Sequence, residues 1–183
     1  MKPDLLRSLS VALLLAIVPV LASGGTHASQ ETAKPSEALK YLEDGSRYYL
    51  KHDFKGAIGP YAKALELEKK HPTLDQTLWR VLIDNLGMAY GISGDLKSAK
   101  ETFEYGLSKD EIYPVFYYNL ACTYAEMNDL DGSIVNLKLA FKYKDNIIAG
   151  EQMPDPAQDD SFQRFLKNDR FIAALREIGQ AAK

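Results

Sequence analysis

Apolar residues recur with helical spacing over most of the chain, and the pattern repeats itself. Three segments share one series: a small residue, a tyrosine three positions later, another small residue nine beyond the tyrosine and a large apolar residue four beyond that. The tyrosines are Tyr48, Tyr90 and Tyr124, so the last two copies are 34 residues apart and the first two are 42 apart. Repeats of this length predict stacked pairs of helices, because one such unit cannot bury its apolar face alone.

The repeat predicts where two helices of a unit approach each other closely. Small residues allow the close approach and large ones fill the space beside it. The positions concerned are Gly45, Gly87 and Ala121, then Ala57, Ala99 and Ser133, then the large Tyr61, Phe103 and Leu137, and finally the small Ala64, Gly106 and Ala140.

Aspartate stands at the same turn in every copy, at Asp53, Asp95 and Asp129. Its carboxylate is suited to cap the helix that follows, since it accepts hydrogen bonds from free N–H groups. The residues just before are His52, Gly94 and Asn128, all tolerant of the left-handed conformation that ends a helix. Recurrence at one turn favours capping over a metal-binding or catalytic role for these aspartates.

This pattern resembles the tetratricopeptide repeat (TPR), a 34-residue pair of antiparallel helices. The resemblance covers units 38–71, 80–113 and 114–147 and implies an all-α fold, an α-solenoid of three TPR-like helix pairs. Unit one departs from the family where Asp44 replaces an expected leucine, and no unit has the usual proline at position 32. Pro114 is expected in the first turn of a helix, where its missing N–H costs nothing.

The insertion at 72–79 separates the first two units. Thr73 and Asp75 precede periodic apolar residues, so the insertion is expected to add turns to the start of the next helix. Trp79, the single tryptophan, is expected to pack against the first helical pair, and the alternative is an exposed anchor for a partner.

Residues 148–183 are expected to form an irregular connection and then C-terminal capping helices, because a stack of helix pairs needs its open end covered. Asp160, and Asp169 or Asn168, are placed as N-caps. This tail is similar to the segment that closes groups of TPR units. The apolar residues that share helical faces are Phe162, Phe165 and Leu166, and then Phe171, Leu175 and Ile178.

The first 28 residues read as a signal peptide: basic residues, then a short apolar run from 11 to 22, then small residues. Cleavage is expected after Ala22 or Ala28, followed by a flexible leader at 29–35 and a helix from Glu37 capped by Ser36. The run is shorter than the ~20 residues that span a bilayer, so no stable membrane span is expected after cleavage. An uncleaved anchor is the alternative. Export predicts a periplasmic or secreted protein.

Composition narrows the classes of function. The 183 residues are 46% hydrophobic and 26% charged with a net charge of −3, as in a globular chain without the basic field typical of nucleic-acid binding. The single cysteine, Cys122, excludes an intramolecular disulfide. Three histidines lack the spacing of a zinc site, and no nucleotide-binding or catalytic motif is present. We therefore expect no metal, no cofactor and no enzyme, an enzyme that uses Cys122 being the disfavoured reading.

The resemblance implies a concave groove lined by the first helix of each unit. Asn85 and Asn119 occupy the same position in successive units, and a pair of amides in register could bind an extended peptide backbone. The alternative is that these side chains pack against neighbouring helices or the tail. The candidate groove residues are Leu42, Ser46, Tyr49, Asp84, Asn85, Met88, Tyr118, Asn119 and Cys122.

The expected function is that of a non-enzymatic, exported TPR module that binds a peptide segment or a protein partner in its groove, as a scaffold or adaptor. The alternative is a structural subunit of a homo- or hetero-oligomeric envelope assembly, whose groove is occupied by the chain itself.

Overall fold

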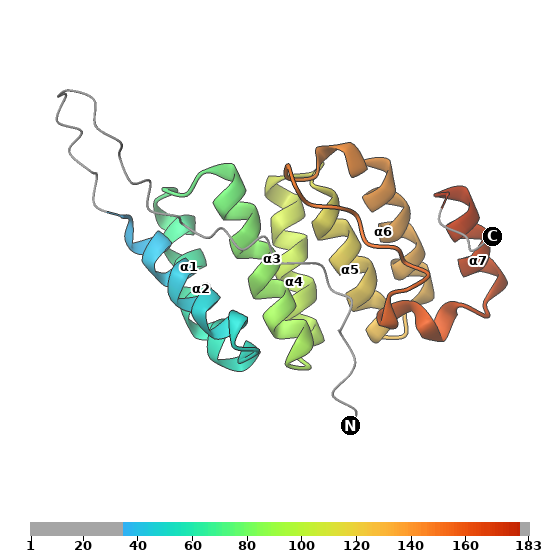
Figure 1. The fold of residues 1–183 in the computed structure, drawn as a ribbon, viewed down its shortest axis with the longest axis horizontal. Helices are drawn as coiled ribbons and strands as arrows, with labels where there is room; N and C mark the ends of the chain where they lie inside the picture. Colours follow the sequence, from blue (N-terminus) through green and yellow to red (C-terminus); the bar gives the residue numbers. More distant parts are fainter. Residues whose placement is uncertain (1–34, 180–183) are drawn as a thin grey trace.

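The computed structural model describes residues 35–179, and every regular element in that range is a helix (Figure 1). The signal peptide expected over 1–28 and all but the last residue of the leader expected over 29–35 lie outside the described residues. In order, the elements are α1 (Glu37–Leu50), α2 (Phe54–Lys70), α3 (Gln76–Ile92), α4 (Leu96–Lys109), α5 (Pro114–Glu126), α6 (Leu130–Lys142), the 3-10 helices η1 (Lys144–Asn146) and η2 (Asp160–Phe165), and α7 (Asp169–Glu177). None of the helices in this range combines the length and apolarity needed to cross a bilayer.

The helices pack in adjacent pairs, α1 with α2, α3 with α4 and α5 with α6, as the repeat predicts. Each pair packs on the next, because α2 contacts α3 and α4 contacts α5. The first helices of the pairs also contact one another, α1 with α3 and α3 with α5. These three helices therefore form a common surface, which we call the first-helix face.

The predicted turns are confirmed. The carboxylates of Asp53, Asp95 and Asp129 accept hydrogen bonds from the N–H groups three residues later, at 2.9, 3.1 and 2.8 Å. The residues before them have positive φ, 59° at His52, 90° at Gly94 and 60° at Asn128. Ser36 caps α1 by accepting from the Leu39 N–H at 3.1 Å, and Pro114 is the first residue of α5.

The insertion lengthens α3, which begins at Gln76 with Asp75 as its N-cap. Buried Glu68 holds the preceding turn: its carboxylate accepts from the N–H and hydroxyl of Thr73 and from the N–H of Leu74. Trp79, expected to pack against the first helical pair, is partly buried against the apolar cluster that contains residues of the first and second pairs. Its ring lies 6.4 Å from that of Tyr105 on α4 and 5.9 Å from that of Phe116 on α5.

Two apolar clusters form the core. One lies among α1–α5 and contains Tyr61, Phe103 and Phe116. The other joins α5 and α6 to the C-terminal elements through Tyr118, Leu137, Phe162, Phe165 and Phe171. The predicted apolar faces of the tail are thus buried against the last helix pair.

The structure corrects one predicted N-cap in the tail by one residue. For the other, it decides between the two alternatives that the sequence left open. Asp159, and not Asp160, caps η2 by accepting from the Ser161 N–H at 2.9 Å. Asn168 caps α7 by accepting from the N–H groups of Arg170 and Phe171. The reason for the first correction is that Asp159 is buried and faces the backbone, whereas Asp160 is exposed.

Candidate partner-binding face

The predicted groove residues lie on α1, α3 and α5, but most are covered. Leu42, Asn85, Met88, Tyr118, Asn119 and Cys122 are all buried, with between 1% and 7% of their surface exposed. Ser46, Tyr49 and Asp84 are partly exposed. The part of the predicted set that is open to a partner therefore belongs to α1 and α3.

Two of the partly exposed residues, Ser46 and Asp84, belong to separate hydrogen-bonded groups. On α1, the Ser46 hydroxyl donates to the Leu42 carbonyl at 2.9 Å and accepts from the Tyr61 hydroxyl at 3.2 Å. On α3 and α5, the Asn119 amide donates to the Asp84 carboxylate. This hydrogen bond joins α5 to α3. Asn119 therefore has a structural role, which is to hold the Asp84 carboxylate in place. Contact of Asn85 and Asn119 with a partner backbone stays a prediction.

A segment of the tail covers α5. Residues 148–166, which we call the strap, run along α5 from its first residues to its last, because contacts with the strap recur in chain order. The Tyr113 hydroxyl donates to the Glu151 carboxylate at 2.9 Å, the Tyr118 hydroxyl donates to Asp159 at 2.9 Å, and Arg164 donates to Glu126 at 2.8 Å. In Figure 1 the strap is the orange trace that crosses the helices before it reaches α7. The share of the first-helix face that belongs to α5 is thus occupied by the chain itself.

Two carboxyl groups from distant parts of the sequence, Asp84 and Glu151, influence each other on this face. Burial and the neighbouring Glu151 raise the pKa of Asp84 to about 7, although the hydrogen bond from Asn119 lowers it. Burial also raises the pKa of Glu151, against the hydrogen bond from Tyr113. Among residues 35–179, neither carboxylate has an ion pair within 4.0 Å. A raised carboxyl pKa without a paired cation means that a positive group placed here would be stabilised.

Arg80, close to this site in sequence, is already engaged. Its Nε donates to Asp110 at 2.7 Å in a largely buried pair, and its guanidinium lies 4.3 Å from the ring centroid of Tyr113. Gln76 donates to the same carboxylate at 3.2 Å. This ion pair ties the end of α4 to α3, and the positive charge of Arg80 lowers the pKa of Glu151 without forming an ion pair with it.

Several residues of this arrangement were missed by the sequence reasoning: Arg80, Asp110, Glu151 and Asp159. Glu151 and Asp159 lie in an irregular stretch, 38 and 41 residues from the tyrosines that donate to them. No local pattern marks such pairs. The only signal in the sequence was a cluster of acids beside Phe162, which a capping role explained equally well.

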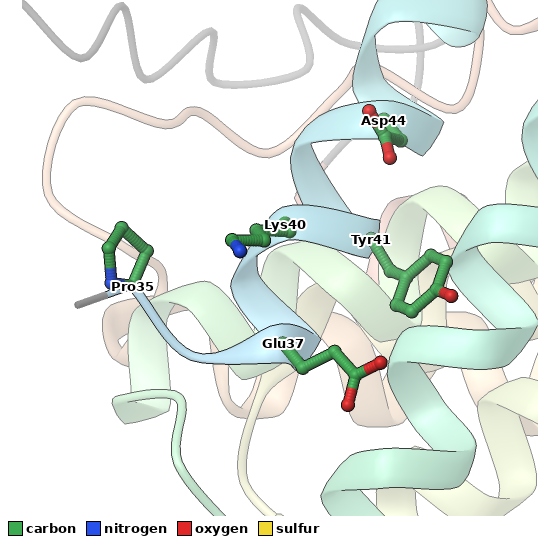
Figure 2. Close-up of a pocket in the computed structure, with 5 residues that line it drawn as sticks. All are labelled: Pro35, Glu37, Lys40, Tyr41 and Asp44. Atoms are coloured by element: carbon green, nitrogen blue, oxygen red, sulfur yellow. The ribbon is translucent and has the colours of Figure 1, made fainter.

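A hollow at α1 is lined by Pro35, Glu37, Lys40, Tyr41 and Asp44. The side chains spread along two turns of the helix and do not converge on one point (Figure 2). Asp44 pairs with Arg47. Its polar, internally paired lining suits an end of the helix stack better than a binding site.

In the described part of the chain, no group of three or more His, Cys, Asp and Glu side chains is placed to hold a metal ion. Cys122 is buried, and burial and Asp159 raise the pKa of its thiol, which keeps it neutral. No family model matches the chain, and a comparison with characterised proteins finds no similar sequence.

Proposed function

We propose that this protein is a non-enzymatic binding module, an α-solenoid of three TPR-like helix pairs, that docks a cationic peptide segment of a partner. The partner binds the part of the first-helix face that is formed by α1 and α3 and is not covered by the strap. The signal-like residues 1–28 support export to the periplasm or beyond. Such a module acts as a scaffold or adaptor.

The repeated architecture supports the TPR-like assignment. The same aspartate cap, left-handed residue and close helix approach recur in all three pairs. Stacking of such pairs creates extended surfaces that suit peptides.

The Asp84–Glu151 site is the observation that carries the choice of partner. Asp84 is partly exposed, Asn119 holds it, and no cation among the described residues pairs with it. Lysine or arginine on a partner would pair with these carboxylates, and Tyr49 beside them supplies apolar area with a polar tip.

Selection of peptides from a random library on the mature chain tests the proposal. We expect enrichment of lysine- or arginine-containing peptides, and a loss of affinity of about tenfold in the double variant Asp84→Asn, Glu151→Gln. The matched control is Glu101→Gln, Glu104→Gln, which removes two carboxylates from α4. Equal binding to the acidic-site variant and the wild type would contradict the proposed site.

A structural subunit is the second candidate, and the strap favours it because the chain already covers α5. End-to-end stacking of copies has less support, since α7 packs on α6 and the hollow at α1 is polar. Size-exclusion chromatography with light scattering separates the two: a stable oligomer that selects no peptide supports the structural subunit.

A further inference from the structure

The strap and the helix that it covers are both acidic. The strap has four acidic residues and one basic residue, a net charge of −3 when all are ionised: Glu151, Asp155, Asp159, Asp160 and Arg164. Glu126 is the single charged residue of α5, and it pairs with Arg164. The helix therefore has no lysine or arginine for the other carboxylates of the strap. Like charges repel each other, so electrostatics oppose the docking of the ionised strap on α5.

Neutral groups hold the strap on α5 against this repulsion. The Tyr113 hydroxyl donates to the Glu151 carboxylate at 2.9 Å. The Tyr118 hydroxyl donates to Asp159 at the same distance. Phe162 is buried in the apolar cluster that joins α5 to the tail. None of these contacts brings a positive charge to the carboxylates.

The first carboxylate of the strap lies beside a carboxylate of α3. Arg80 and Asp84 are four residues apart, on one face of α3. The Arg80 guanidinium lies 4.3 Å from the centroid of the Tyr113 ring, and the hydroxyl of that ring binds Glu151. Glu151 is therefore brought close to Asp84. The nearby positive charge of Arg80 is already paired with Asp110, at 2.7 Å.

The other described side chains that influence this pair of carboxyl groups are neutral. They are Tyr49 of α1, Tyr61 of α2 and Asn119 of α5. Burial and Glu151 raise the pKa of Asp84 to about 7, and burial raises the pKa of Glu151. When the strap leaves α5, Glu151 enters water and no longer acts on Asp84, so both pKa values fall. The closed strap thus binds protons more tightly than the open one and loses stability relative to it as the pH rises through about 7.

We propose that the strap is a pH-dependent cover of α5, which is closed while the Asp84–Glu151 pair holds a proton and opens when both groups are ionised. Opening exposes the part of the first-helix face that α5 contributes. The open face is then limited to α1 and α3 at acidic pH and extends to α5 above neutrality. Strap opening needs no partner, so it does not depend on the proposed function.

Labelling of the Cys122 thiol measures strap opening, because Cys122 is buried and its Sγ lies 3.8 Å from Asp159 of the strap. The labelling rate of the mature chain is divided by the rate of the same chain unfolded in urea at the same pH, which removes the pH dependence of thiolate formation. Between pH 6 and pH 8.5 we expect this ratio to rise about 5- to 10-fold. Urea unfolding followed by the fluorescence of Trp79, the single tryptophan, gives the constant for global unfolding at each pH.

The double variant Asp84→Asn, Glu151→Gln removes both ionisable groups and keeps their volumes. We expect its labelling ratio to rise less than ~2-fold over the same pH range. The matched control Glu101→Gln, Glu104→Gln on α4 should rise as the wild type does. Should the double variant fail to fold, Glu151→Gln alone removes the charge that acts on Asp84, and its rise should be at most about half that of the wild type.

The pH-dependent cover is overturned if the wild-type ratio does not change with pH, or if the double variant or Glu151→Gln rises as the wild type does. A ratio equal to the constant for global unfolding also overturns it, because the strap then does not open by itself. Peptide selection plays no part in this experiment. A pH-dependent ratio together with a failed peptide selection would therefore reject the proposed function and leave the cover intact.

Discussion

The ring of Phe103 on α4 fills the space that a Cβ on Gly87 of α3 would need. A Cβ built at Gly87 would lie 2.5 Å from the ring. The first pair repeats the relationship, since a Cβ at Gly45 would lie 2.4 Å from the Tyr61 ring. At the same positions the third pair has Ala121 and Leu137. Glycine thus accompanies an aromatic ring, and alanine accompanies the smaller leucine.

Gly87→Ala is expected to destabilise the protein by about 1–3 kcal/mol, because overpacking forces the ring or the helix to move. Adding Phe103→Leu should recover part of that loss, since the pair then matches Ala121 and Leu137. Urea unfolding of the two single variants and the double variant measures the coupling between them.

Gly91→Ala, one turn further along α3, is the control. A Cβ there would meet Ala99 at an ordinary 3.7 Å, and alanine is better than glycine inside a helix by about 0.5–1 kcal/mol. If Gly87→Ala and Gly91→Ala have the same effect on the free energy of unfolding, the close packing of Gly87 on Phe103 is wrong.

Each aspartate cap should contribute measurably to the free energy of unfolding. Asp129→Ala is expected to cost about 1 kcal/mol, because the Gly132 N–H loses its acceptor at 2.8 Å. Asp129→Asn should restore most of the stability, since asparagine caps almost as well. Thermal unfolding of both variants checks this, and equal losses would show that the charge matters and the cap does not.

The strap should open more often when the buried hydrogen bond between Tyr118 of α5 and Asp159 of the strap is removed. Tyr118→Phe leaves the carboxylate of Asp159 without the hydroxyl donor at 2.9 Å, at a cost of about 1–3 kcal/mol. Cys122 lies in the same cluster and is the only cysteine. We therefore expect a thiol reagent to label Cys122 at least ~10-fold faster in Tyr118→Phe than in the wild type.

Tyr117→Phe provides the control for the strap, because its hydroxyl donates to the Glu111 carbonyl at an exposed site. Labelling of Cys122 should be unchanged there. A Tyr118→Phe variant that labels as slowly as the wild type would mean that the hydrogen bond between Tyr118 and Asp159 does not keep the strap closed.

Asp84 should make stability fall as the pH rises. Its pKa is raised from 3.8 to about 7, so the folded state holds the proton more tightly. The stability that the protonated Asp84 contributes is fully present below 3.8, its pKa in the unfolded state. It is lost as the pH rises through about 7, its pKa in the folded state. A shift of this size corresponds to at most about 4 kcal/mol, and partial exposure reduces it.

Asp84→Asn removes the pH-dependent loss of stability, because the new side chain does not ionise. Its amide oxygen can still accept the hydrogen bond from Asn119. Relative to the wild type, we expect Asp84→Asn to gain about 1–2 kcal/mol of unfolding free energy between pH 4 and pH 8. Urea unfolding across this range measures the gain, with exposed Asp145→Asn as the control. A stability difference that does not change with pH would contradict the raised pKa.

The repeat determined where the second helix of each pair begins and how the chain turns into it. Asp53 and Gly94 act through their own backbone and the next few residues, so the sequence around them suffices to predict their roles. The small positions such as Gly87 were also predictable, because close helix contact within a pair depends on residues about one repeat unit apart or less.

Only the tertiary structure decided which part of the first-helix face is open. Asp159 and Glu151 reach Tyr118 and Tyr113 across an irregular strap, and their pairing depends on its path through space. The Asn119 amide, predicted to contact a partner, donates to Asp84 of the neighbouring pair. Hydrogen bonds and charge coupling between distant segments follow no sequence period, and for this reason the Asp84–Glu151 site emerges only once the chain has folded.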